Sequence, residues 1–221
     1  MSIVEFKAKK KVILFNGAPN SGKDESARIM QQLLDEGSVV SFKTELYKLT
    51  AKHFGMNLSK FIKIAQDRNT KELKTKELIN NSGLSFLQKL KLYVIGLFKM
   101  VGMSPREAMI FVSEEIVKPK FGSKFFGHKI VETMSEIDSN FFFVPDSGFV
   151  SELQPLVDAG YDVHVVRIKR DGCSFDNDSR IELTDELLKP FGIKGIDVDN
   201  NGTLDELSDK LLVITVDKII R

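Results

Sequence analysis

Two kinds of hydrophobic pattern alternate along the chain. Short runs of β-branched and aromatic residues predict strands, and longer stretches with apolar positions three and four residues apart predict helices. The predicted strands are 11–16, 38–42, 140–146, 162–170 and the first part of 196–202. A helix is predicted to follow the first strand and to end at about 36, with Gly37 as a stop. Further helices are predicted over 147–160, 184–191 and 203–220. This alternation implies right-handed crossovers, so we expect an α/β fold of three layers around a parallel five-stranded sheet.

The middle of the chain shows helical periodicity and no convincing strand. Helices are predicted over 44–53, over most of 56–103 with a polar break at 80–83, and over 104–136. Ser104, Pro105 and Glu107 have the spacing of a capping box with proline at the first helical position, which marks a strong helix start. We therefore expect one domain over 1–221, with a core of 1–43 and 136–221 and a helical insertion of about 44–135.

Composition narrows the function classes. The 221 residues include 42% hydrophobic and 29% charged residues with a formal net charge of +1, which is typical of a globular protein and provides no basic field for nucleic acid. Lysines interrupt the apolar segment 84–103, so we expect it to pack on the domain rather than span a membrane. A homodimer formed through this segment is an open alternative. The single cysteine, Cys173, excludes an internal disulfide and fits a reducing cytoplasm. We see no secretory signal, and the three histidines share no metal-ligand spacing.

The segment 12–24, VILFNGAPNSGKD, has the strongest chemical signal. A strand pattern runs into G-x-x-x-x-G-K, formed by Gly17, Gly22 and Lys23, and a helical pattern follows at once. Strand, glycine loop and helix is the context of a P-loop, whose amides surround phosphate oxygens at a helix N-terminus. We predict that it binds a nucleoside triphosphate or a similar phosphorylated compound, through Gly17, Ala18, Asn20, Ser21, Gly22, Lys23, Asp24 and Glu25.

Two carboxylates are candidate Mg²⁺ ligands. Asp24 stands where a P-loop usually has Ser or Thr, and a carboxylate there can hold Mg²⁺ directly or through water. Asp146 ends the apolar run FFFVPD, where it can bind Mg²⁺ through water or cap the helix that follows. Both loops lie beyond the carboxyl ends of predicted strands, where ligands bind in parallel sheets.

Several basic residues are candidates for binding substrate phosphates. Arg106 lies in the first turn of a capped helix, where the helix dipole disfavours a cation, so a role in anion binding explains it. Lys43 and Lys48 follow the second strand, and Arg68 lies in a polar stretch whose alternative interpretation is a solvated face.

The loop after the strand 162–170 resembles a lid. Arg167 and Lys169 lie on one face of that strand, and Arg170 and Arg180 flank a polar loop at about 170–183. Arginines of a closing lid neutralise the transferred phosphoryl group and exclude water. The alternative is salt bridging to Asp171, Asp176 or Asp178.

Together these segments resemble the deoxynucleoside monophosphate kinases of tailed phages, a branch of the adenylate-kinase-like P-loop kinases. The resemblance covers about residues 11–212. It is carried by GAPNSGKD, SFKTELYKLTAKHFG, SPREAMIFVSEEIVKPKFGSKFF, VPDSGFVSELQPLVDAGYDVHVVRIKR, NDSRIEL and VDNNGTLDELSDKL.

The resemblance implies transfer of the γ-phosphoryl of ATP to a deoxynucleoside monophosphate, with Mg²⁺. Lys23 and the loop amides would hold ATP, and Arg106, with Lys48 and Arg68, would bind the monophosphate. Arg170 and Arg180 would act at the transferred group. The protein would then be cytoplasmic, in the host cytoplasm if a phage encodes it.

The chain departs from the family at two places, and two alternatives stay open. Many relatives have arginine where this chain has Gly148, and histidine is common where it reads 178–180. The alternatives are a P-loop kinase of another small metabolite and a nucleotide-binding switch without phosphotransfer.

Overall fold

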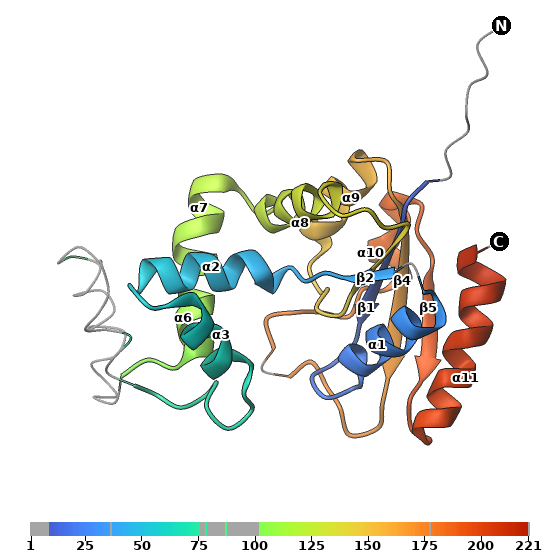
Figure 1. The fold of residues 1–221 in the computed structure, drawn as a ribbon, viewed down its shortest axis with the longest axis horizontal. Coiled ribbons are helices and arrows are strands. Elements are labelled where there is room, and N and C mark those ends of the chain that lie inside the picture. The colour runs from blue at the N-terminus through green and yellow to red at the C-terminus, as the bar shows by residue number, and fades with distance from the viewer. Residues whose placement is uncertain are drawn as a thin grey trace, which may run out of the picture. The chain divides into compact units, whose positions relative to one another are not determined.

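The computed structural model describes residues 9–35, 37–75, 78, 87, 102–176 and 178–220. Five strands pair in parallel, in the order β2-β3-β1-β4-β5 (Figure 1). Their bounds are β1 (Lys11–Asn16), β2 (Gly37–Val39), β3 (Phe141–Val144), β4 (Asp162–Lys169) and β5 (Gly195–Asp199). The predicted α/β class and parallel five-stranded sheet are confirmed.

One face of the sheet is covered by the first and last helices. Helix α1 (Lys23–Leu33) packs against α11 (Leu204–Ile214), which continues as η4 (Thr215–Ile220). Ile13 and Phe15 of β1 alternate with Val12 and Leu14, and the odd positions join the core beneath these helices. The rest of this core is Ala27, Ile29, Met30, Phe143, Val166, Ile168, Val198, Leu207, Leu211 and Ile219.

The other face is covered by the helices on either side of β3. Helix α9 (Leu153–Asp158) contacts β4, and it follows directly on η2 (Val150–Glu152). Gly127 of α8 (Phe125–Ser135) lies against Pro155 and the Glu152 carbonyl, so closely that a Cβ there would stand 2.7 Å from Pro155 Cγ. After β4 come α10 (Asp185–Leu188) and η3 (Lys189–Phe191).

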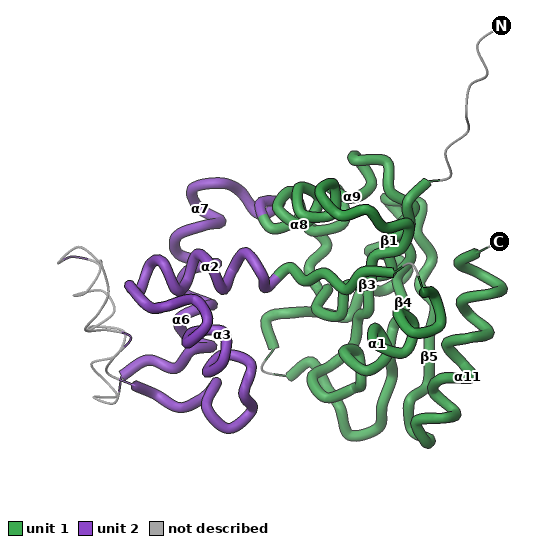
Figure 2. The backbone as a smooth tube through the Cα atoms, in the orientation of Figure 1, with its two compact units in different colours: residues 1–42, 126–221 green, residues 43–125 purple. Residues whose placement is uncertain are grey.

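The chain forms two compact units, coloured separately in Figure 2. Unit 1 is Met1–Phe42 with Phe126–Arg221 and holds the sheet, and unit 2 is Lys43–Phe125. Unit 2 contains α2 (Lys43–His53), α3 (Leu58–Gln66), α6 (Pro105–Phe111), η1 (Val112–Val117) and α7 (Lys118–Phe121). The capping box is present, since Glu107 N donates to Ser104 Oγ at 3.2 Å and Ser104 N donates to Glu107 Oε2 at 2.9 Å.

Several predicted boundaries were wrong. Helix α1 ends at Leu33 and Gly37 begins β2, because the turn after the helix closes three residues earlier than its apolar pattern indicates. The stretch 121–136 is not one helix, since Gly122 has φ +86° and separates α7 from α8. The predicted helix over 147–160 begins at Val150. The predicted break at 80–83 lies outside the described residues, as does the predicted helix 84–103 except for Leu87, Gly102 and Met103.

Among the helices in the described part of the chain, none has the length and apolar character that crossing a membrane requires.

Candidate functional site

The loop between β1 and α1 has the shape of a phosphate cradle. Asn20 and Gly22 adopt positive φ values of 66° and 103°, which turn the loop back on itself. The position before α1 is Gly22, which has no side chain to cap the first amides of the helix. These amides and the positive end of the α1 dipole are therefore suited to an anion.

Two glycines of this loop are required by close contacts. A Cβ on Gly17 would stand 2.6 Å from both the Ile168 carbonyl oxygen and Ser21 Oγ, and one on Gly22 would stand 2.3 Å from Asn200 Nδ2. Ser21 is fully buried, and its Oγ has no hydrogen-bond partner among the described residues. A buried hydroxyl that lacks a partner inside a glycine cradle fits a bound phosphate oxygen.

Lys23 lies across the loop that precedes it. It is buried, and its Nζ donates to the Ala18 carbonyl at 2.7 Å. Asp24 and Glu25 occupy the first turn of α1, where the helix dipole favours acids. Glu25 makes a two-point ion pair with Arg28, and this hydrogen bond lowers the pKa of Glu25. Glu25 is therefore paired with Arg28, whereas the charge of Asp24 acts on Arg180.

Asp146 connects the ends of two strands. It is buried, its Oδ2 accepts from Ser41 Oγ at 2.8 Å, and its Oδ1 accepts from Phe42 N at 3.2 Å. Asp146 thereby joins the segment after β3 to the segment after β2. The helix after Asp146 begins at Val150 with Phe149 at the cap position, so Asp146 is not its N-cap.

Arg180 lies in unit 1 beside these acids. Its Nε and Nη2 donate to Asp178 at 3.1 and 2.7 Å, and the side chain of Asp178 is only 3% exposed. Burial alone would lower the pKa of Arg180, but the hydrogen bonds and charge of Asp178, with the charges of Asp146 and Asp24, raise it. Within the described residues, Nη1 donates no hydrogen bond, so that group remains for an anion.

The aliphatic part of Arg180 covers Gly148. A Cβ on Gly148 would stand 2.5 Å from Arg180 Cβ and 2.7 Å from its Cγ. The space that a side chain at 148 would need is therefore filled by Arg180.

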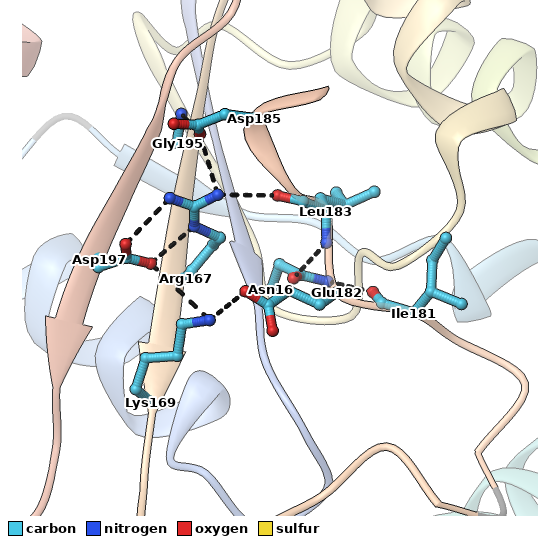
Figure 3. A network of polar contacts seen from close by, with 9 residues as sticks. All are labelled: Asn16, Arg167, Lys169, Ile181, Glu182, Leu183, Asp185, Gly195 and Asp197. Carbon is cyan, nitrogen blue, oxygen red and sulfur yellow. Dashed lines mark hydrogen bonds and ion pairs between the residues drawn. The ribbon is translucent and has the colours of Figure 1, made fainter. Parts of the chain in front are cut away.

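Arg167 and Lys169 lie on one face of β4, as predicted, and have structural partners (Figure 3). The buried Arg167 donates to Asp197 at 2.7 and 3.0 Å, to Asp185 at 2.9 Å and to the Leu183 carbonyl at 3.3 Å. Lys169 pairs with Glu182 and lies 3.9 Å from Asp197. Burial opposes the charge of Arg167, yet the two aspartates raise its pKa.

Arg170 lies in a different setting from Arg180. It is exposed at the turn after β4, and it lines a cavity of about 360 Å³. The cavity lies beside the start of the loop between β1 and α1, called the phosphate loop below. This cavity is also lined by Asn16, Gly17, Ala18, Lys169 and Phe175. Cys173 lies at its edge and is a free thiol.

The predicted acceptor residues belong to unit 2, apart from the phosphate loop in sequence. Arg106 Nη1 lies 3.3 Å from Glu72 Oε1, and the side chain of Arg106 is 30% exposed. Lys43 begins α2, and Lys48 lies 3.4 Å from Glu45 on the same helix. Arg68 is exposed, and it follows the end of α3 instead of lying in a helix as predicted.

The acids of unit 1 suit a metal that is held together with phosphates. Among the residues that the structure describes, no group of three or more His, Cys, Asp or Glu side chains could hold a metal ion. The charges of Asp24 and Asp146 both help to raise the pKa of Arg180. Mg²⁺ typically binds one or two carboxylates, waters and substrate phosphates, and this pair fits that requirement.

Two residues that contact the site were missed in the sequence. Asn200, after β5, donates to the Ser21 carbonyl at 2.7 Å, and Asn16 contacts residues 181–183. The salt bridge between Arg180 and Asp178, which the sequence offered as an alternative, is observed. A signal was available for Asn16, which is a polar residue that ends an otherwise apolar buried strand. Asn200 lies in a polar loop, where residue type gives no such signal.

Comparisons with known proteins add a general likeness. The chain is similar to the APS kinase CysC of Mycobacterium tuberculosis in complex with AMPPNP and APS, with 13% identity over 95% of this chain and 99% of that one and a TM-score of 0.41. It is similar to TT1252 of Thermus thermophilus, with 13% identity over 95% and 98% of the two chains and a TM-score of 0.43. At these scores neither likeness carries an argument about reaction or substrate. No protein-family model matches the chain. No curated protein matches it in sequence.

Proposed function

We propose that this protein is a kinase that transfers the γ-phosphoryl of ATP to a deoxynucleoside monophosphate, giving a deoxynucleoside diphosphate and ADP. The observation that carries the proposal is the phosphate loop of unit 1, with buried Lys23 inside it and with Arg180, Asp24 and Asp146 grouped by their charges. Phosphoryl transfer needs positioning and charge neutralisation more than covalent help, and these residues supply both.

The nucleotide would bind at the loop from Gly17 to Asp24. Its amides and the α1 N-terminus would hold the phosphates, and Lys23 would exchange its hydrogen bond to the Ala18 carbonyl for phosphate oxygens. Mg²⁺, when bound, neutralises charge between the β- and γ-phosphates, and Asp24 and Asp146 would hold it directly or through water.

The acceptor would be held by its own phosphate. The resemblance to the phage kinases assigns this role to Arg106, with Lys48 and Arg68, and Lys43 is a further candidate because it follows the second strand. An arginine in the first turn of a capped helix is placed against the helix dipole, which supports an anion as its partner. A monophosphate oxygen is already an anion at neutral pH, so no general base is required.

A kinetic assay tests the proposal. ATP and Mg²⁺ are supplied with dGMP, dTMP, dCMP, dAMP and the ribonucleotides, and turnover is followed for the wild type, Arg106→Ala and Lys23→Ala. We expect turnover with at least one deoxynucleotide. Arg106→Ala should raise the KM for that acceptor about 10- to 100-fold, the worth of one charge-assisted hydrogen bond. Lys23→Ala should lower kcat by about 10²- to 10³-fold.

Lys118→Ala is the matched control for Arg106→Ala. It removes a cation of unit 2 that, like Arg106, is paired with a glutamate, in this case Glu114. Its kinetics should equal those of the wild type. Binding of ATP without turnover on any monophosphate would contradict the proposal, and would favour another acceptor or a switch.

A further inference from the structure

Asn16 is a buried polar residue at the edge of the site. The proposed nucleotide binding gives no role to this residue. It is fully buried at the end of β1, directly before the phosphate loop. Buried amides are kept satisfied because an unpaired donor or acceptor costs about 1–3 kcal/mol. The partners of this amide therefore indicate what it does.

The Asn16 amide binds one short segment at two points. Nδ2 donates to the Ile181 carbonyl at 2.9 Å, and Oδ1 accepts from Leu183 N at 3.0 Å (Figure 3). The side chain thus pairs with residues 181–183 as a neighbouring strand would. Nδ2 also lies 3.5 Å from the Ser147 carbonyl, so all the acceptors around it are backbone oxygens.

Other contacts bring the same segment to the strand ends. Ile181 N donates to the Gly148 carbonyl at 3.1 Å, and Arg167 donates to the Leu183 carbonyl at 3.3 Å. Arg180 immediately precedes this segment, and its stem fills the space over Gly148. The position of Arg180 therefore depends on where residues 181–183 are held.

We propose that Asn16 is a positioning residue for phosphoryl transfer, which acts by fixing residues 181–183 so that Arg180 stays over Gly148 beside the phosphate loop. This inference rests on the proposed function. Asn16 itself touches no reacting group, and any effect it has on the chemical step passes through Arg180.

A double-mutant cycle tests this dependence. Asn16→Ala, Arg180→Ala and the double variant are compared with the wild type for kcat and for the KM of ATP and of the acceptor. Asn16→Ala should lower kcat by about 10²-fold, the effect of misplacing a group by roughly 1 Å. In the Arg180→Ala background the same change should alter kcat by less than about threefold. An equal loss in both backgrounds would overturn the proposal.

Ser147→Ala is the matched control. Ser147 is buried beside Asn16, and its Oγ donates to the Phe15 carbonyl at 2.9 Å and makes no hydrogen bond to the described residues 180–183. It removes one buried hydrogen bond at the same strand end, so it should destabilise the fold while kcat stays unchanged. A fall in kcat equal to that of Asn16→Ala would mean that general loosening explains both.

A readout without turnover separates this inference from the proposed function. In the wild type the Arg180 Nε–H is held by Asp178, so its proton should exchange slowly with solvent in a nitrogen-15 NMR experiment. In folded Asn16→Ala this exchange should be at least about tenfold faster. Unchanged protection of that proton would overturn the positioning role even if the kinase reaction is established. If the wild type has no kinase activity while protection is lost as expected, only the proposed function fails.

Gly148→Ala provides a second variant should Asn16→Ala not fold. The φ of Gly148 lies outside the left-handed region, so alanine fits the backbone, but its Cβ would stand 2.5 Å from Arg180 Cβ. Arg180 must then move while the Asn16 amide is intact. We expect a kcat loss similar to that of Asn16→Ala, and full activity would show that the seat of Arg180 is immaterial and overturn the proposal.

Discussion

The two halves of the loop after β4 look alike in sequence and differ in structure. Residues 170–172 are exposed at a turn, with Arg170 among them, whereas Asp178 and Leu183 are buried and residues 181–183 are held by Asn16 and Gly148. Both halves carry an arginine that the sequence assigns to one lid. The structure separates them, since the stem of Arg180 is packed over Gly148 and the exposed Arg170 lines a cavity. A preorganised cation costs no reorganisation during the reaction.

Removal of Arg180 should have the largest effect. Arg180→Ala removes a cation at the transferred group together with the ion pair of the buried Asp178 side chain. We expect kcat to fall by about 10³-fold and the free energy of unfolding to fall by about 3 kcal/mol. Urea unfolding and steady-state kinetics measure the two losses. Adding Asp178→Asn to Arg180→Ala should restore much of the stability and none of the activity, and recovery of both would contradict a role in catalysis.

Removal of Arg170 should affect activity alone. Its side chain is exposed, so Arg170→Ala should change the free energy of unfolding by less than about 0.5 kcal/mol. We expect kcat to fall by about 10²-fold through lost charge at the phosphates. The same two measurements apply, and a kcat equal to that of the wild type would remove Arg170 from the site.

Removal of Arg167 should affect stability more than activity. Arg167→Met removes the hydrogen bonds to Leu183, Asp185 and Asp197, and we expect a loss of about 2 kcal/mol in unfolding free energy. Lys169→Met, on the same strand face, removes a half-exposed pair and should cost less than about 1 kcal/mol. Lys169→Met should keep kcat within about threefold of the wild type, whereas Arg167→Met should also lower kcat through the lost hydrogen bond to the Leu183 carbonyl. A large loss of kcat in Lys169→Met would place that cation in the reaction.

A change of pH should alter the stability of unit 2 through His53 and leave the loop after β4 unchanged. His53 Nε2 is buried without a hydrogen-bond partner among the described residues, and burial lowers the pKa of His53. The unfolded chain takes up this proton at about pH 6.5 and the folded chain only at lower pH. The contribution of His53 to stability is therefore present above about pH 6.5 and is lost as pH falls towards its folded pKa.

The pH dependence of unfolding, measured by urea denaturation between pH 7.5 and 5, checks this contribution. His53→Gln should make the dependence shallower, and the Arg170→Ala variant should show the wild-type slope because arginine does not titrate in this range. An unchanged slope in His53→Gln would contradict the assignment.

The sequence was sufficient for the elements that have a local cause. The strand and glycine loop around Gly17 and Gly22 and the capping box at Ser104 follow from patterns a few residues long, and the parallel sheet follows from the alternation of strands and helices. The division of the loop after β4 has no such cause. It depends on contacts between Asn16 and Leu183 and between Gly148 and Arg180. Asn16 and Leu183 are 167 residues apart in the sequence, and both contacts depend on side-chain geometry.

Identification of the reaction products tests whether the protein transfers a phosphoryl group from ATP to a deoxynucleoside monophosphate. The protein is incubated with ATP, Mg²⁺ and each deoxynucleoside monophosphate in turn, and the nucleotides are separated by anion-exchange chromatography. We expect the accepted monophosphate to be converted to its diphosphate and ADP to form in equal amount. ADP with inorganic phosphate and no deoxynucleoside diphosphate, whatever acceptor is present, would contradict it.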